Sequence, residues 1–251
     1  MEYTLKKSLG QHFLKDESVS QRILKELQKF PFSRLLEVGP GGAALTKYLL
    51  QVPGIDLKCV ELDTEKVNWL HKNFSSLNGK IIHGDILTIP KPFEEPFSLV
   101  GNFPYNISTQ IVFRVIEWRN DVQCIIGMFQ KEVAERIASK EGSKVYGVTS
   151  VLVQAFFEVE YLFEVLPESF NPPPKVTSSV IRLVPRKVDA AIRSERALFV
   201  LVKTAFGQRR KTLRNAVKSL FTPEELESPL FAKRAEQLSV DEFAALTHRM
   251  K

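Results

Sequence analysis

Residues 35–46 constrain the fold of this chain more than any other stretch, because an apolar run there breaks into glycines and then resumes with helical spacing. The residues through Val38 predict a strand covered on both faces, and residues 44–49 place apolar side chains at helical intervals. Between them, the turn at 39–42 contains glycines, which permit positive φ and the close approach of another molecule. We expect the free N–H groups and the positive dipole end of the following helix to face a ligand above this turn.

Two residues in this stretch indicate what kind of ligand the turn would accept. Glu37 is an acid inside an apolar strand, which costs free energy unless the carboxylate is hydrogen-bonded or meets a polar ligand. Pro40 stiffens the turn and removes an N–H group that a pyrophosphate cradle would use. A nucleoside without phosphates therefore fits better than a dinucleotide, and an ordinary strand-to-helix turn is the alternative interpretation.

The charge of the chain is placed unevenly. The net charge is +6, and residues 186–251 account for all of it, with 14 Lys and Arg against 8 Asp and Glu. Such asymmetry favours an acidic polymer as partner, nucleic acid before membrane, although a basic segment can also be only a solvated face. No apolar run approaches the ~20 residues of a membrane helix and the first residues lack the apolar block of a secretory signal, so we expect a cytoplasmic protein.

The cysteines and histidines give no sign of a metal site. Cys59 and Cys124 each lie in an apolar, strand-like run, where a small buried side chain is the expected role. The four histidines show no metal-ligand spacing. We therefore expect neither a disulfide framework nor a bound metal.

Strand and helix patterns alternate along most of the chain, which predicts an α/β fold with a mostly parallel sheet and helices on both faces. The expected strands are 35–38, 55–60, 80–83, 97–100 and 122–129, and 156–166 with 176–183 are expected to form an antiparallel pair closing the sheet. The first expected helix is capped by Asp16 and ends near Pro31, and the others are 44–49, 64–73, 109–117, 132–139, 196–206, 212–220 and 240–247. The segment 148–155 could be helix or strand, and we favour helix. We place a boundary near residue 187, giving a domain at 1–187 and a small basic helical domain at 188–251.

Polar residues follow four of the expected strands. The glycine turn follows the first strand, Glu61 the second, Asp85 the third and Asn102 the fourth. Ligands of open parallel sheets bind beyond the carboxyl ends of the strands. Glu61 also follows the turn by roughly 20 residues, the interval at which a carboxylate accepts bonds from ribose hydroxyls. Taken singly, these acids could be helix caps or surface residues, but together they predict a nucleoside pocket.

The tetrapeptide Asn102-Phe103-Pro104-Tyr105 indicates the chemistry. Proline keeps Phe103 out of the helical region, which fixes the direction of its carbonyl group beside the side-chain oxygen of Asn102. Two such acceptors can bind both hydrogens of a planar amino group, while Tyr105 offers a ring for the attached base. Accepting both N–H bonds draws the amine nitrogen toward a tetrahedral form and frees its lone pair for attack, which stabilises the transition state. The alternative is a turn with a buried asparagine.

A series of motifs, in the same order along nearly the whole chain, resembles the ribosomal RNA adenine dimethyltransferase family. The motifs are 10–14 (GQHFL), 37–41 (EVGPG), Glu61 at a strand end, 84–87 (GDIL), 102–105 (NFPY), 130–136 (QKEVAER), 146–147 (YG), 170–176 (FNPPPKV) with Ser178, and 209–215 (RRKTLRN). The resemblance implies a Rossmann-like methyltransferase domain that uses S-adenosylmethionine. It implies dimethylation of the exocyclic amine of two adjacent adenosines near the 3′ end of small-subunit ribosomal RNA, with the immature small subunit as partner and a monomeric enzyme.

The resemblance also implies roles for individual residues. His12 and Leu14 would line the cofactor, Gly39 and Gly41 would approach its methionine part, Glu61 would bind its ribose, Asp85 and Ile86 its adenine, and Asn102 would lie between cofactor and target amine. Asn102, Phe103, Pro104 and Tyr105 would form the catalytic motif, with attack on the methyl group needing no metal and no dedicated base. Arg209, Arg210, Lys211 and Arg214 would hold RNA phosphates.

The sequence departs from the family pattern at two positions and leaves two other functions open. Phe103 stands where family members commonly have Leu, which could change the grip on the target base, and Ala43 stands where related enzymes often have Gly. A large-subunit ribosomal RNA adenine methyltransferase of the antibiotic-resistance kind shares the fourth-strand motif. A non-catalytic ribosome assembly or transcription factor would keep the fold and the basic segment without the chemistry.

Overall fold

The computed structural model describes residues 12–187 and 191–251, and within them the chain forms two compact units. The first comprises the chain up to Ala134 together with Glu160–Pro185, and the second comprises Glu135–Val159 together with Arg186–Lys251. The chain leaves the first unit for the last time after Pro185, close to the boundary expected near residue 187. Residues 135–159, however, group with the C-terminal helices. The functional division into a methyltransferase domain at 1–187 and an RNA-binding domain at 188–251 stays a prediction.

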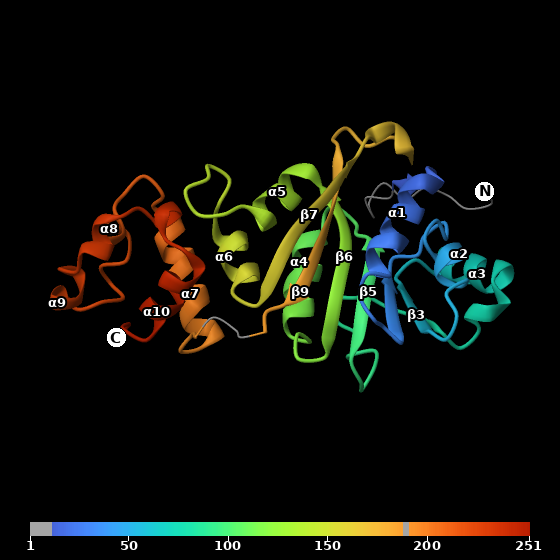
Figure 1. Cartoon of the computed structure of the whole chain (residues 1–251), viewed down its shortest axis with the longest axis horizontal. Helices are drawn as coiled ribbons and strands as arrows, with labels where there is room; N and C mark the ends of the chain where they lie inside the picture. Colours follow the sequence, from blue (N-terminus) through green and yellow to red (C-terminus); the bar gives the residue numbers. More distant parts are fainter. Residues whose placement is uncertain (1–11, 188–190) are drawn as a thin grey trace. The chain divides into compact units, whose positions relative to one another are not determined.

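A seven-stranded sheet forms the centre of the first unit, in the order β4-β3-β2-β5-β6-β9-β7 (Figure 1). Its strands are β2 Arg34–Val38, β3 Asp56–Glu61, β4 Ile81–His83, β5 Phe97–Asn102, β6 Val122–Gln130, β7 Phe157–Val165 and β9 Ser178–Pro185. The pairs β2–β3, β3–β4, β2–β5 and β5–β6 are parallel, and β9 runs antiparallel to β6. The predicted mostly parallel α/β sheet is confirmed, including the neighbouring strands that close it.

Four helices of the first unit connect or cover these strands. They are α1 Glu17–Leu27, α2 Thr46–Leu49, α3 Thr64–Asn73 and α4 Ser108–Ile116, with the short 3₁₀ turn η2 Ser75–Leu77 after α3. Asp16 caps α1 as expected, because its carboxylate accepts the N–H group of Ser18. α1 lies on one face of the sheet and α4 on the other, so the strands between them are covered on both sides (Figure 1). This two-sided cover explains why the strand sequences are apolar rather than alternating.

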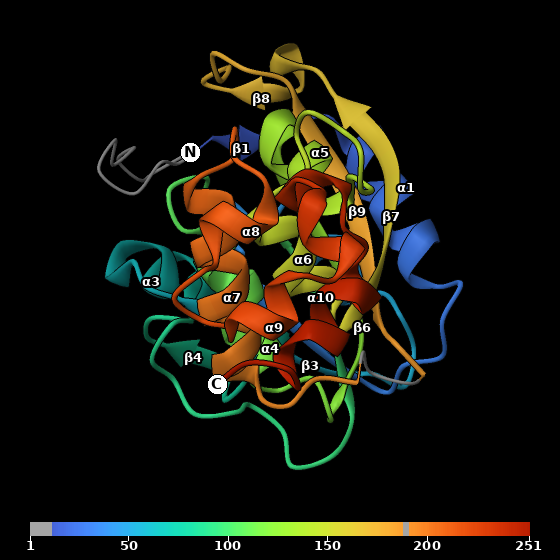
Figure 2. The same cartoon turned by 90° about the vertical axis from the view of Figure 1, so that its left-hand side faces the viewer.

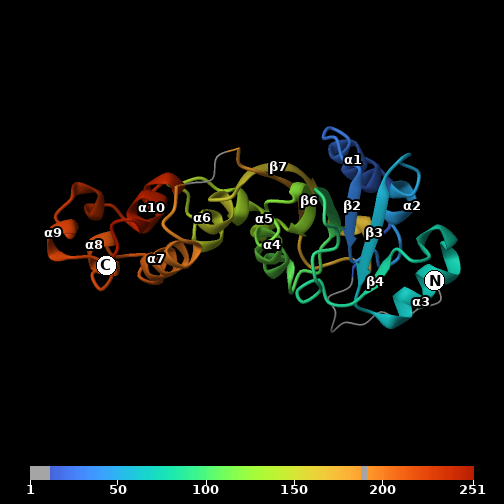
Figure 3. The same cartoon turned by 90° about the horizontal axis from the view of Figure 1, so that it is seen from below.

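The strand order reverses between β2 and β5. From β2 the chain continues outward through β3 and β4, which lie beside it in Figure 3, and it then returns to place β5 and β6 on the other side of β2. The register pairs Glu37 of β2 with Cys59 of β3 and with Val100 of β5. The loops after β2 and β5 therefore leave the same sheet edge in opposite directions, the arrangement that opens a ligand crevice in such folds.

The helix expected at 44–49 is shorter than the sequence pattern predicts. α2 begins only at Thr46 and has four residues. The chain before it winds through positive φ at Gly39 (69°), Gly41 (51°) and Ala43 (61°). Because a left-handed residue cannot be part of a right-handed helix, no helix can include Ala43, and the helix observed is two residues shorter at its start than the pattern predicts. The expectation that the positive end of this helix faces a ligand stays a prediction. Ala43 adopts the conformation that glycine would take more easily.

The second unit is helical (Figure 2). It contains the second half of α5 Lys131–Ala138, then α6 Val148–Gln154, α7 Glu195–Gly207, α8 Leu213–Ala216, α9 Pro223–Leu226, α10 Val240–Thr247 and the 3₁₀ turns η4 Pro229–Ala232 and η5 Ala235–Gln237. The helix expected at 212–220 ends early, because the backbone leaves helical geometry at Val217.

Candidate functional site

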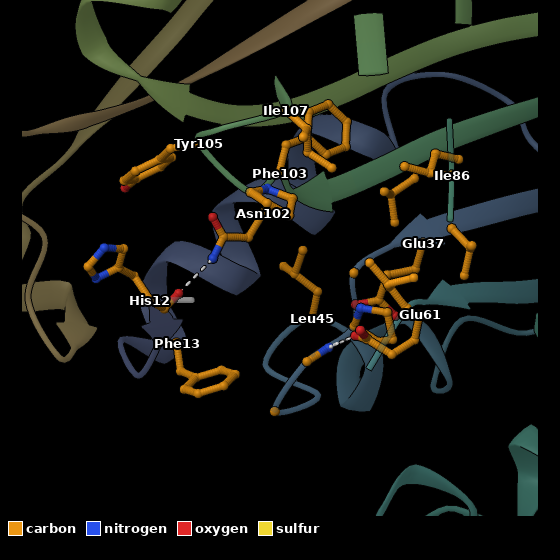
Figure 4. Close-up of a pocket in the computed structure, with 18 of the residues that line it drawn as sticks. His12, Phe13, Glu37, Leu45, Glu61, Ile86, Asn102, Phe103, Tyr105 and Ile107 are labelled. Carbon is orange, nitrogen blue, oxygen red and sulfur yellow. Dashed lines mark hydrogen bonds between the residues drawn. The ribbon is translucent and has the colours of Figure 1, made fainter. Parts of the chain in front are cut away.

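A cavity of about 200 Å³ lies in the first unit at the carboxyl ends of β2, β3 and β5. Every residue predicted to bind cofactor or to act in catalysis lines it, as Figure 4 shows for those it labels. These residues are His12, Leu14, Gly39, Gly41, Glu61, Asp85, Ile86, Asn102, Phe103, Pro104 and Tyr105. Sequence positions 12 to 105 are brought together because each polar residue ends its strand at the same edge.

Glu61 ties the end of β3 to the glycine turn. Its carboxylate accepts the N–H group of Gly41 (3.2 Å) with one oxygen and that of Asp63 (2.9 Å) with the other. The side chain is buried, and desolvation raises its pKa although these backbone donors oppose the shift. Each oxygen retains a second lone pair, so the carboxylate can accept hydroxyl donors from the cavity while its orientation is fixed from behind.

Asp85 and Ile86 form the wall beyond β4. One oxygen of Asp85 accepts the N–H group of Leu87 (2.9 Å), a local turn that orients the carboxyl group. Ile86 is buried and supplies an apolar surface beside it. A polar acceptor next to an apolar wall suits the amino edge and the face of a purine.

Glu37, which the sequence analysis noted as an acid that needs a hydrogen bond or a polar ligand, also lines the cavity. It lies one residue before the end of β2, is almost fully buried, and accepts a weak hydrogen bond from the thiol of Cys59 (3.6 Å). Burial raises its pKa from 4.5 to about 7, with the nearby carboxylate of Glu61 acting in the same direction. An acid in an apolar strand was the available signal, but the sequence could not show that its side chain faces the cavity rather than the helices.

Asn102 ends β5 with its amide group held from one side. Its Nδ2 donates to the carbonyl oxygen of His12 (3.1 Å), and its Oδ1 points away from that bond (Figure 4). The following N–H group, that of Phe103, donates to Met128 on β6 (3.2 Å). The strand end is therefore fixed by the sheet, and the amide by the N-terminal arm, with an acceptor left for a ligand.

Phe103, which stands where members of the resembled family commonly have Leu, packs its side chain into the core beside the cavity. Its side chain is fully buried, and its ring meets the ring of Phe129 edge-on (centroids 5.2 Å apart, 89°). A Cβ atom at Gly101 or Gly127 would lie 2.8 Å or 2.5 Å from this ring. A phenylalanine ring is larger than a leucine side chain, and the glycines at these two positions of β5 and β6 leave room for it.

Tyr105 is held at its hydroxyl group and on one ring face. The hydroxyl is hydrogen-bonded to Oγ of Ser178 on β9, and the ring of His12 stacks on it (centroids 5.6 Å apart, 28°). Desolvation raises the pKa of the Tyr105 hydroxyl. The predicted platform is therefore present, with one of its faces covered by His12.

The basic residues predicted to hold RNA belong to the second unit and differ in their surroundings. Arg209 donates to the carbonyl of Lys144 (2.6 Å) and pairs with Glu236 (3.5 Å), so it holds a loop of its own unit. The side chains of the other three, Arg210, Lys211 and Arg214, are exposed.

Both cysteines are buried with free thiols, as expected. Across residues 12–187 and 191–251, no group of three or more His, Cys, Asp or Glu side chains is arranged to hold a metal ion. In the same residues, no helix is long and apolar enough to cross a bilayer.

The sequence of the chain matches the family described as Ribosomal RNA adenine dimethylase over residues 2–251. A protein of Flavobacterium johnsoniae named Ribosomal RNA small subunit methyltransferase A is 51% identical, over 98% of this chain and 95% of the relative. One of the same name from Cytophaga hutchinsonii is 47% identical, over 98% and 96%. These identities extend across both compact units.

Solved structures of two methyltransferases share the fold. A dimethyladenosine transferase from Plasmodium falciparum aligns with a TM-score of 0.79 at 23% identity, covering 95% of this chain and 99% of that one. The 23S rRNA methyltransferase ErmE aligns with a TM-score of 0.71 at 22% identity, with the same coverage. The fold alone is thus common to a dimethyladenosine transferase and to an enzyme named for 23S rRNA, whereas the family match and the much closer sequence relatives are specific. On these grounds the chain belongs to the ribosomal RNA adenine dimethylase family.

Proposed function

We propose that this protein dimethylates the exocyclic amine of two adjacent adenosines near the 3′ end of small-subunit ribosomal RNA, with S-adenosylmethionine as methyl donor. The observation that carries the proposal is the placement of Asn102. Its free amide oxygen lies at the end of β5, in the same cavity as the glycine turn and the buried carboxylate of Glu61. A nucleoside-binding end and an amine-binding end thus share one cavity.

The residues of the cavity fit S-adenosylmethionine. The glycine turn is open at Gly39, where a Cβ atom would meet nothing within 4 Å, so a ligand can approach the backbone closely. Glu61 would accept the ribose hydroxyls, and Asp85 with Ile86 would bind the adenine edge and face. Among the described residues that line the cavity there is no Lys or Arg, and Pro40 interrupts the row of N–H donors that a pyrophosphate would need. When bound, the cofactor supplies an electrophilic methyl group.

The side chains of the motif at 102–105 would prepare the target amine. Oδ1 of Asn102 and the carbonyl oxygen of Phe103 would accept its two N–H bonds, which localises the lone pair on nitrogen and stabilises the charge that develops there. Tyr105 would support the base by stacking. The base must leave its helical stack to reach this position, which costs a few kcal/mol and favours a loop or a distorted helix.

The basic segment at 209–214 would hold the RNA backbone. Arg210, Lys211 and Arg214 are exposed, so their charges are available to phosphates. We further expect the enzyme to act as a monomer in the cytoplasm on the immature small subunit.

The proposal is tested by methyl transfer from labelled S-adenosylmethionine to purified small subunits that lack the modification, with large subunits as the matched control substrate. We expect about four methyl groups per small subunit, and primer extension that stops at two adjacent adenosines near the 3′ end. Label on the large subunit instead would support the antibiotic-resistance type of enzyme. Binding to small subunits without any transfer would support a non-catalytic assembly factor.

A further inference from the structure

The connection between β7 and β9 reaches back to the cavity and holds the N-terminal arm. It contains the 3₁₀ turn η3 Pro167–Ser169 and the short strand β8 Phe170–Asn171, which pairs antiparallel with β1 Phe13–Leu14. The carbonyl of Ser169 accepts the N–H groups of Lys15 (2.9 Å) and Asp16 (3.2 Å). These bonds place His12 at the mouth of the cavity, where Nδ1 of its ring is 2.9 Å from the carbonyl oxygen of Pro172.

The same connection ends at two serines that face opposite sides of β9. Ser178 and Ser179 are both fully buried, and each is hydrogen-bonded to a tyrosine hydroxyl. Ser178 bonds Tyr105 at the cavity, whereas Ser179 bonds Tyr161 of β7 (2.6 Å). Because successive side chains of a strand point to opposite faces, only Ser178 reaches the site. β9 thus provides a candidate functional residue, Ser178, and a matched control, Ser179.

We propose that Ser178 is a positioning residue for methyl transfer, which holds the ring of Tyr105 at the place where it supports the target base. This inference rests on the function proposed above. A tyrosine ring is set by two torsion angles: the hydrogen bond at the hydroxyl group, which lies on the axis of the second, restrains the first and so the position of the ring, while the stacked ring of His12 restrains its tilt. His12 stacks on one face of the ring and Ser178 holds its hydroxyl, so the ring has a single orientation without contributing an atom to the reaction.

Loss of the Ser178 hydroxyl leaves the buried hydroxyl of Tyr105 without its partner and lets the ring turn toward another acceptor. A small displacement of the base moves its amine away from the acceptors at Asn102 and Phe103, and such misplacement lowers the rate of the chemical step rather than cofactor binding. Ser178 therefore acts through Tyr105, and removing either hydroxyl should have the same consequence.

The test compares Ser178→Ala, Ser179→Ala, Tyr105→Phe and the double variant Ser178→Ala/Tyr105→Phe in steady-state transfer to unmodified small subunits. We expect Ser178→Ala and Tyr105→Phe each to lower kcat/KM about tenfold, with the cofactor dissociation constant unchanged, and the double variant to be no slower than either. Ser179→Ala should keep wild-type transfer while losing a similar amount of thermal stability. Equal activities of Ser178→Ala and Ser179→Ala, or multiplicative losses in the double variant, would overturn the inference.

Crystal structures of the two serine variants provide a readout that does not depend on activity. The Tyr105 ring should rotate in Ser178→Ala and keep its place in Ser179→Ala, whereas an unmoved ring in both refutes the positioning role. If the wild-type protein transfers no methyl group to either subunit, the proposed function is wrong, and the ring orientation still decides whether Ser178 positions Tyr105.

Discussion

At the scale of single residues, the site depends on polar side chains that bind the protein with one part of the group and face a ligand with another. The amide of Asn102 donates from its nitrogen to the carbonyl of His12 and keeps its oxygen for a ligand. The carboxylate of Glu61 accepts two backbone N–H groups on its rear side and retains acceptor capacity toward the cavity. In both cases a hydrogen bond to the protein fixes the orientation of the group, so its remaining acceptor is positioned before a ligand binds.

The first prediction concerns the acceptor at Asn102. Replacing Asn102 with Ala should lower methyl transfer by about 100-fold or more, because an acceptor that acts only in the transition state is lost. Cofactor affinity, measured by calorimetry, and affinity for small subunits, measured by filter binding, should stay within about twofold of wild type. Undiminished transfer by this variant would refute the catalytic role of the amide.

The second prediction concerns the pH dependence that Glu37 introduces. Its pKa is about 7 in the folded protein and ordinarily 4.5, so between these values the folded state binds more protons than the unfolded state. Its contribution to the free energy of unfolding is therefore complete below pH 4.5 and lost as the pH rises to about 7, by an amount on the order of 3 kcal/mol. Urea unfolding of wild type and Glu37→Gln from pH 5 to 8 should show the variant gaining stability relative to wild type as pH rises. Parallel curves would contradict the raised pKa.

At the scale of elements, the glycine turn and the basic segment show what secondary structure adds. The turn stays non-helical as far as Ala43 because Gly39, Gly41 and Ala43 take left-handed conformations. At Gly39 it offers a ligand open backbone. The basic segment at 209–214 runs from the loop after α7 into α8, which contains Arg214. Of its predicted phosphate ligands, Arg209 is held within its own unit, through Lys144 and Glu236.

The third prediction separates these roles. Replacing Arg210, Lys211 and Arg214 together with Ala should weaken binding to small-subunit RNA and reduce the slope of log K against log salt by about two to three, since each phosphate contact contributes about 0.7 to 0.9. Arg209→Ala is the matched control. It should lower the free energy of unfolding by about 1 to 3 kcal/mol, because it frees the loop at Lys144, and should change the salt slope less than the triple variant. A triple variant with an unchanged slope would place the phosphate contacts elsewhere.

At the scale of the whole molecule, the cavity is contained in the first unit, and the second unit carries the basic segment. The second unit is made from two stretches of chain, residues 135–159 and 186–251. Between them, residues 160–185 return to the first unit. A ligand held by residues 12 to 107 therefore stabilises a unit whose sheet also contains β9 from far along the sequence.

The fourth prediction follows from that containment. S-Adenosylhomocysteine, the demethylated form of the cofactor, should raise the free energy of unfolding by about 2.7 kcal/mol at one hundred times its dissociation constant, because it binds only the folded cavity. The measurement is urea unfolding with and without the ligand. Glu61→Ala should bind it more weakly and show a smaller gain at the same concentration. No stabilisation of the wild-type protein would mean that the cavity holds some other ligand.

The sequence by itself determined the strand and helix alternation, the parallel sheet and the set of residues at its edge. The apolar runs that end in Glu61, Asp85 and Asn102 predict parallel strands, and the carboxyl ends of parallel strands meet at one edge of the sheet. The pattern failed where local and tertiary preferences conflict. Ala43 takes a left-handed conformation, and the backbone leaves helical geometry at Val217, neither of which the spacing of apolar residues reports.

Only the tertiary structure decided how the edge residues are oriented. The contact of Asn102 with His12 spans 90 positions and that of Tyr105 with Ser178 spans 73, so no local pattern could predict either. Packing of the Phe103 ring against Gly101 and Gly127 likewise depends on two neighbouring strands. Periodicity records which face of an element is buried, because burial repeats along the chain. The direction of a single amide or ring is set by one partner, and that partner is known only once the chain has folded.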